Sequence, residues 1–149
     1  MRELRLRNLL SLAEGHMHGG RFLRAVAIYS RALEISQPGE FEHEFCHARL
    51  GDLRVGMGNF QAALPHLRMI RALNETEPLY ALMLGRVLLE LGVYEEAGAH
   101  LMDALISPFY ATEAYSELSR VAEKLGEPET ANRLRCRANQ SPGAQTLNR

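Results

Sequence analysis

A short pattern of three residues recurs along the chain and constrains its fold more than any other feature. A glycine is followed two residues later by an aromatic residue and five residues later by an alanine. The copies are Gly20-Phe22-Ala25, Gly58-Phe60-Ala63 and Gly92-Tyr94-Ala97, with a weaker one at Gly126-Pro128-Ala131. Successive glycines are 38, 34 and 34 residues apart. A nearly fixed period of this length indicates an array of small structural repeats.

A second pair of positions keeps the same register. Eight residues before each glycine stands a leucine followed by a small residue: Leu12-Ala13, Leu50-Gly51, Leu84-Gly85 and Leu118-Ser119. A small side chain lets two helices approach closely, and a glycine supplies a turn with positive φ. Each repeat is therefore predicted to be a hairpin of two antiparallel helices. Neighbouring hairpins must stack, because one hairpin cannot bury its apolar side alone.

The apolar periodicity predicts four first helices, at about 5–18, 42–57, 78–91 and 111–125. The second helices are expected at about 23–36, 60–74, 95–106 and 128–139. Asn59 is predicted to cap its helix, and Pro128 suits a first helical position. Pro65 falls inside a predicted helix and predicts a kink or a late start there. The extra four residues of the first interval fall in the turn-rich segment 37–40.

These slots, together with Ala32-Leu33 and Ala104-Leu105, resemble the tetratricopeptide repeat family. The family's early tryptophan is absent, Ile70 replaces its late alanine in the second repeat, and Arg135 takes an apolar slot in the fourth. The resemblance implies an all-α fold, a right-handed superhelical solenoid of about four antiparallel helix pairs. It implies one domain, residues 1–139, with repeats at about 6–39, 44–77, 78–111 and 112–139. The polar segment 140–149 is predicted to be disordered.

Composition limits the function classes. The chain has 149 residues and 17 basic side chains against 18 acidic ones, which argues against a nucleic-acid partner. The longest apolar stretch is broken by Arg86 and Glu90 and is too short to span a bilayer. Cys46 and Cys136 are too far apart for a ligand or redox pair, which is typical of free thiols in a reducing cytosol. We therefore expect a cytoplasmic protein, and its arginine-rich basic set suggests a bacterial source.

One motif resembles a catalytic one. His43-Glu44-Phe45-Cys46-His47 matches H-E-x-x-H, which on a helix presents two imidazoles and a glutamate to a zinc ion. A zinc-dependent hydrolase is thus a remote alternative. His47, however, occupies a slot that packs against the following helix, so its ring is predicted to lie between helices. We expect the protein to have no enzymatic activity and to hold no cofactor or metal ion. Whether His43 and His47 bind a metal ion adventitiously is left undecided.

The family resemblance also implies where a partner would bind. First helices of tetratricopeptide repeats line a concave groove, and the groove slots that we select as a partner site are Leu10, Met17, Phe45, Asp52, Val55, Leu79, Leu82, Arg86, Leu89 and Arg120. The segment from Leu79 to Tyr94 is apolar nearly all round, which indicates exposed leucine at an interface. Its leucines are expected to accept apolar side chains, and Arg86 and Arg120 to orient carboxylates. Alternatively, the leucines are covered within the molecule or in a homodimer.

The resulting function is a non-enzymatic module that binds a peptide or helix of a partner protein, as an adaptor or scaffold does. The alternative resembles bacterial secretion chaperones of tetratricopeptide build, which hold an apolar client segment. The carboxylate clamp that some family members use for acidic tails is not expected, since only Arg49 has suitable chemistry among its slots.

Overall fold

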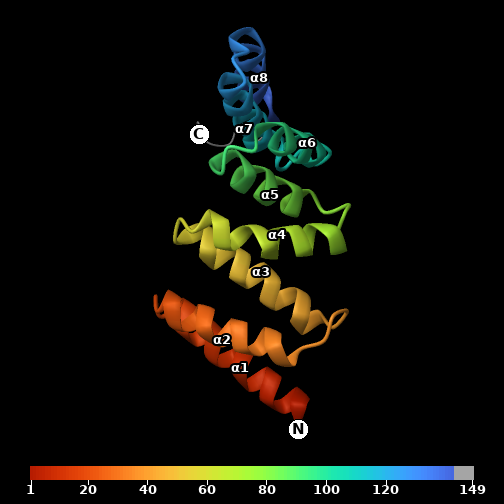
Figure 1. Ribbon diagram of the computed structural model, residues 1–149. Coiled ribbons are helices and arrows are strands. Elements are labelled where there is room, and N and C mark those ends of the chain that lie inside the picture. Colours follow the sequence, from red (N-terminus) through yellow and green to blue (C-terminus); the bar gives the residue numbers. More distant parts are fainter. Residues whose placement is uncertain (143–149) are drawn as a thin grey trace. The chain divides into compact units, whose positions relative to one another are not determined.

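The computed structural model describes residues 1–142, and eight α-helices joined by short connections make up most of that range (Figure 1). In chain order they are α1 (Arg2–His18), α2 (Phe22–Ile35), α3 (Phe41–Gly56), α4 (Phe60–Leu73), α5 (Pro78–Glu90), α6 (Tyr94–Ala104), α7 (Ala111–Lys124) and α8 (Pro128–Gln140). No strand occurs among these 142 residues. Every helix bound lies within three residues of its predicted position.

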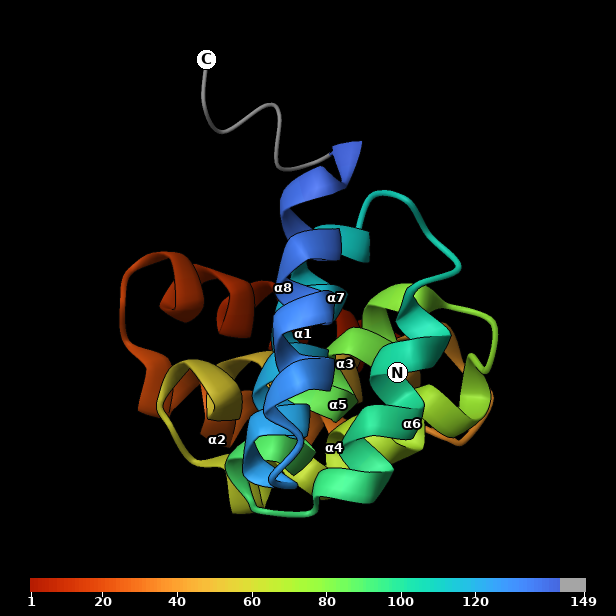
Figure 2. The same ribbon diagram turned by 90° about the horizontal axis from the view of Figure 1, so that it is seen from above.

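The helices pair as the repeat predicts. Contacts join α1 with α2, α5 with α6, and α7 with α8, and the last pair lies side by side in Figure 2. Helices α3 and α4 meet where Gly51 faces Leu67. The chain divides into two compact units, which we call unit 1 (Met1–Ile70) and unit 2 (from Arg71 onward). The extent of the predicted domain, 1–139, stays a prediction, and of the predicted disordered tail, residues 143–149 lie outside the described residues.

One turn closes all four hairpins. Its glycine takes positive φ in each copy, 71° at Gly20, 72° at Gly58, 80° at Gly92 and 77° at Gly126. The residue after the glycine donates its N–H to the carbonyl five residues back, as Arg21 does to His16 at 2.9 Å and Asn59 to Arg54 at 2.8 Å. This bond marks a Schellman-type helix end, and its left-handed residue favours glycine because a Cβ is strained there. The predicted role of the repeated glycines is confirmed.

The small residues also have the predicted role. A Cβ added to Gly51 would lie 2.8 Å from Leu67 Cδ2, and one added to Gly85 would lie 2.6 Å from Leu101 Cγ. The missing side chain of each glycine is therefore the space that a leucine of the paired helix fills. First and second helices of these two hairpins approach closely because of it.

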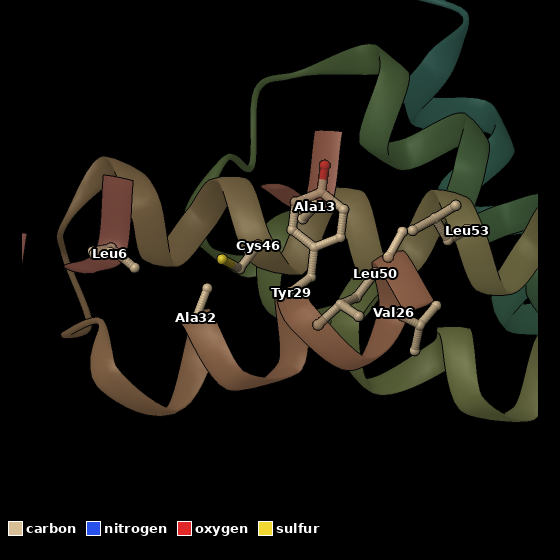
Figure 3. Close-up of a cluster of buried hydrophobic side chains, with 9 residues drawn as sticks. Leu6, Ala13, Val26, Tyr29, Ala32, Cys46, Leu50 and Leu53 are labelled. Atoms are coloured by element: carbon tan, nitrogen blue, oxygen red, sulfur yellow. The ribbon is translucent and has the colours of Figure 1, made fainter. Parts of the chain in front are cut away.

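The core of unit 1 forms around Tyr29, which is fully buried. Figure 3 shows its ring between Ala13 of α1 and Leu50 of α3, with Cys46 nearby. Side chains from three helices thus bury one aromatic ring, and α2 stacks on α3 as well as on its own partner α1. The core of unit 2 is built in the same way, with Leu101, Leu118 and Val121 buried.

Helix α4 differs from its prediction at one residue. It starts at Phe60 and continues through Pro65, so the predicted late start is wrong. The Ala62 N–H donates to Asn59 Oδ1 at 3.2 Å, which confirms the predicted cap. Together with buried Ala63 and Leu67, that cap holds the first turns in place despite the proline. Pro128 occupies the predicted first position of α8.

The four extra residues of the first interval lie between α2 and α3, as predicted. Glu40 ties this connection together, because it accepts a 2.8 Å hydrogen bond from the Gln37 N–H and forms an ion pair with Arg2. These two interactions lower the pKa of Glu40, with the Gln37 bond as the larger cause.

Candidate functional site

The predicted groove residues of unit 1 lie on α1 and α3. Leu10, Met17 and Phe45 are partly buried and pack against the core cluster, and Val55 is partly buried as well. Asp52 is exposed on α3. The first helices of unit 1 therefore carry apolar side chains that still reach the surface.

An aromatic pair extends this surface. The Phe41 and Phe45 rings stack with centroids 5.8 Å apart and an interplanar angle of 29°. Phe41 is largely exposed, and the guanidinium carbon of Arg49 lies 5.0 Å from the centroid of the Phe45 ring. One face of Phe41 is therefore available to another side chain, beside a cation-π contact.

A polar contact crosses the same region. Glu14 of α1 accepts hydrogen bonds from the Tyr29 hydroxyl and from Arg49 Nε, the latter at 3.0 Å. Burial, followed by the bond to Glu14, raises the pKa of Tyr29 above its ordinary value. Glu14 and Arg49 are thus engaged with each other, and they hold α1 and α3 at a fixed spacing. We call Leu10, Met17, Phe41, Phe45, Asp52 and Val55 the groove face of unit 1.

The leucines of α5 differ from their prediction. Leu82 is 2% exposed and Leu89 4% exposed, so the expectation of contiguous exposed leucine on this helix is wrong for both. Leu79 is partly buried. A helix that is apolar all round is typical of a covered position, and this burial favours the alternative that the leucines are covered within the molecule. Whether any of the three contacts a partner stays a prediction.

The two predicted groove arginines of unit 2 are engaged with carboxylates of the chain itself. Arg86 lies 3.8 Å from Glu113 and 3.5 Å from Glu117. Arg120 donates to Glu90 at 2.8 Å and to Glu117 at 2.7 Å, and these bonds raise its pKa. A partner carboxylate would have to compete with these glutamates.

The H-E-x-x-H motif has the geometry of a packing contact. His47 is buried, with its Nδ1 2.9 Å from Nδ1 of His66 on α4, and the ring centroids are 5.2 Å apart. His43 places its ring centroid 4.9 Å from that of His47, and its Nδ1 lies 3.0 Å from Ser36 Oγ. The predicted position of the His47 ring between helices is confirmed.

The same histidines lack further ligands. In the part of the chain that the structure describes, no group of three or more His, Cys, Asp or Glu side chains is placed to hold a metal ion. Burial and the imidazoles of His66 and His43 lower the pKa of His47 to about 4, so its ring is neutral at pH 7.

Comparison with known proteins identifies the repeat. Residues 48–111 match the sequence model of the tetratricopeptide repeat family. These residues are tetratricopeptide repeats. No curated protein sequence matches the chain.

Solved structures share the fold of these tetratricopeptide repeats. A crystal structure of MamA protein is 20% identical with a TM-score of 0.80, and the match covers 95% of this chain and 75% of that one. MamA from residue 41 onward of Desulfovibrio magneticus RS-1 is 16% identical, with a TM-score of 0.82 and coverages of 97% and 78%. MamA of MSR-1 is 20% identical, with a TM-score of 0.83 and coverages of 94% and 78%. The predicted fold class, an all-α solenoid of helix pairs, is confirmed.

Two residues at the surface of unit 1 are missing from the predicted site set. Phe41 lies just before the predicted helix start, and Arg49 contacts the ring of Phe45. Phe41, Phe45 and Arg49 follow one another at every fourth position, and this spacing is the signal that could have found them, because such residues share a helix face. No helix within residues 1–142 is long and apolar enough to cross a lipid bilayer.

Proposed function

We propose that this protein is a non-enzymatic adaptor that binds a peptide or an amphipathic helix of a partner protein on the groove face of unit 1. The match of residues 48–111 to tetratricopeptide repeats carries the proposal, since these repeats are protein-interaction modules. A cytoplasmic location and a bacterial source are parts of the same proposal.

The side chains of the groove face suit an apolar ligand. Leu10, Met17 and Phe45 are fixed by the core beneath them, so binding costs little side-chain entropy. Phe41 offers an exposed aromatic face, which is the kind of residue that anchors protein interfaces. The ligand is therefore expected to present apolar side chains at helical spacing.

The contribution of unit 2 is expected to be smaller. Arg86 and Arg120 already hold Glu90, Glu113 and Glu117, so a partner carboxylate gains only the difference between two ion pairs. Leu82 and Leu89 are buried, and a substitution there would disturb the fold before it reported on binding.

Site-specific photocrosslinking in the source organism tests the proposal. A photoreactive residue in place of Phe41 should give a covalent adduct with a partner protein, which mass spectrometry then identifies. The same residue at Arg31, exposed on α2 outside the groove face, should give none. An aggregation-prone secreted client would indicate the chaperone alternative, and a component of a stable assembly would indicate the adaptor.

A binding measurement with the purified partner completes the test. Phe41→Glu should weaken binding by roughly tenfold or more, because it places a charge in an apolar contact. Phe109→Glu is the matched control, since Phe109 is as exposed as Phe41 but lies between α6 and α7. Equal affinities of the two variants, with unchanged circular dichroism, would show that the groove face does not bind the partner.

A further inference from the structure

The first helix exposes a residue that its counterparts bury. Leu12, Leu50 and Leu118 each stand eight residues before a turn glycine and so occupy the same slot of successive repeats. Leu50 is 1% exposed and Leu118 is 8% exposed, whereas Leu12 is 53% exposed. The equivalent position of α1 is thus also a leucine, but no neighbouring helix packs over its side chain among the described residues.

In later repeats the leucine at this position is buried by the second helix of the preceding pair. Leu50 belongs to the core cluster that contains Tyr29 and Ala32 of α2, and α7, which carries Leu118, packs against α6. The helix α1 has no such neighbour among the described residues. This side of α1 carries Leu4, Leu12 and the exposed backbone position of Gly15.

The uncovered side of α1 carries two shallow, open depressions. Two surface hollows, of about 310 Å³ and 550 Å³, share Asn8 and Leu12 in their linings. Leu4, Asn8 and Leu12 follow one another at four-residue spacing and therefore form one row along the helix. Gly15 continues the row, and a Cβ built there would meet nothing within 4 Å, so the backbone is open to close approach. We call this row, with Arg5 and Arg21 at its sides, the end face.

The charges of the end face distinguish between occupants. Arg5 lines the smaller hollow and Arg21 the larger one, and neither hollow is lined by an acidic side chain. Arg21 Nε donates to His16 Nδ1 at 2.8 Å, so it bonds to a ring nitrogen and not to a carboxylate. A second copy related by a two-fold axis would set these basic ends against each other. A helix with acidic residues beside its apolar stripe would instead place negative charges next to Arg5 and Arg21.

We propose that the end face is a docking site for an amphipathic helix of another protein, which lies on α1 as α2 lies on α3 and carries acidic residues beside its apolar stripe. This site is separate from the groove face and extends the array by one helix. The stacking of α2 on α3 supplies the template for the occupant, with small and aromatic side chains toward the slot.

Two synthetic helices test the site on the full-length chain. The acidic probe has the sequence of residues 22–35 with both arginines, Arg24 and Arg31, replaced by glutamate, and the basic probe keeps them. Both carry a lactam bridge between the positions of Leu23 and Ala27, because isolated helices of this length are marginal in water. Fluorescence anisotropy should show binding of the acidic probe, and roughly fivefold or more weaker binding of the basic one.

Matched variants assign the binding to the end face. Leu12→Glu should weaken the acidic probe by roughly tenfold or more, while Leu23→Glu, an exposed leucine that lines neither hollow, should leave it unchanged. Leu4→Glu serves as a second variant if Leu12→Glu alters the circular dichroism. Phe41→Glu should have no effect on this probe, which separates the end face from the groove face.

Three results would overturn the proposal. The first is that neither probe binds, and the second is that Leu23→Glu weakens binding as much as Leu12→Glu. The third is a dimer of the chain in light scattering that Leu12→Glu dissociates, since a second copy would then be the occupant.

Discussion

The imidazoles of His47 and His66 face each other inside unit 1 and lie close enough for one to donate to the other. At most one of the two rings can be protonated while this bond persists, because protonation of both would set two donors together. Burial lowers the pKa of both rings, and His43 adds to the effect on His47 and Arg54 to that on His66. Protonation of both rings would therefore break this contact between α3 and α4.

Acid should weaken the fold through this pair. The pKa of His47 falls from 6.5 in the unfolded chain to about 4 in the folded one, so the unfolded chain takes up the proton first as pH decreases. The stabilisation is complete above the unfolded value and is lost as pH falls from about 6.5 toward 4. Urea unfolding should show a free energy of unfolding that is about 1–2 kcal/mol lower at pH 5 than at pH 7, because solvent screening reduces the full effect of the shift.

A neutral replacement checks the assignment of this pH dependence. His47→Gln keeps a hydrogen-bonding side chain but cannot take up a proton, so it should flatten the decrease. His18→Gln, at an exposed position on α1, is the control and should behave as the parent chain does. An unchanged slope in His47→Gln would rule out His47 as the source.

For single residues, the sequence predicts which side chains pack between helices better than it predicts which side chains are exposed to solvent. The slot of His47 in the repeat is enough to place its ring between helices, because the register of the glycines fixes which side of each helix faces its partner. The pairing of His47 with His66 does not follow from that register, since it depends on the rotamers of both side chains. The predicted exposure of Leu82 is wrong for a related reason. The sequence shows that a residue is apolar, but not whether its own chain or a partner covers it.

The contact between the helices of a pair depends on a small residue, which makes glycine substitutions informative. Gly85→Ala adds a Cβ only 2.6 Å from Leu101 Cγ, and it should lower the free energy of unfolding by about 1–3 kcal/mol, as overpacking does. Gly15→Ala adds a Cβ in open space on a helix, and it should raise the same quantity by about 0.5–1 kcal/mol. Thermal unfolding of both variants by calorimetry measures the difference.

The opposite signs are the essential part of this prediction. Both substitutions improve the intrinsic helix propensity by the same amount, so a purely local effect would stabilise both variants. Stabilisation by Gly85→Ala would mean that Leu101 moves aside without cost.

Helix positions are the most predictable part of the molecule, since four copies of one turn fix where each hairpin begins and ends. Pro65 shows the limit of local rules: its intrinsic cost is outweighed by the cap at Asn59 and by the buried side chains of the same helix. The predicted helix starts one residue after Phe41, whereas α3 includes Phe41. Because Phe41 is helical, its ring can stack on that of Phe45 one turn later.

Each of the two compact units contains one cysteine, and the reactivity of its thiol reports on the solvent access of that unit. Cys46 is fully buried in the core of unit 1, and burial raises its pKa to about 12, whereas Cys136 is exposed on α8. Only the thiolate attacks a disulfide reagent, so Cys136 should react rapidly with Ellman's reagent at pH 8 and Cys46 only when unit 1 opens. Cys136→Ser should abolish the fast phase and leave the slow one.

Rapid reaction of both thiols in the parent chain would contradict this picture of unit 1. The slow phase should accelerate with urea in parallel with the loss of helical circular dichroism, because Cys46 packs with Tyr29 and Leu50.

The groove is the feature of the whole molecule that the sequence predicts least. Its slots follow from the family resemblance, but their availability depends on what covers them and on which charges they already hold. Arg86 and Arg120 illustrate this point, since Arg86 of α5 pairs with Glu117 of α7, and Arg120 of α7 pairs with Glu90 of α5. Among the predicted groove leucines of unit 2, Leu82 and Leu89 are buried, whereas the apolar groove side chains of unit 1 are only partly buried.

The uniform glycine turn has an evolutionary consequence. Its hydrogen bonds lie entirely within six residues, so every hairpin carries its own closing device wherever it stands in the array. A gene duplication or deletion of one 34-residue block among the later hairpins therefore keeps the remaining hairpins in phase. Such a chain can change its number of repeats in a single genetic step.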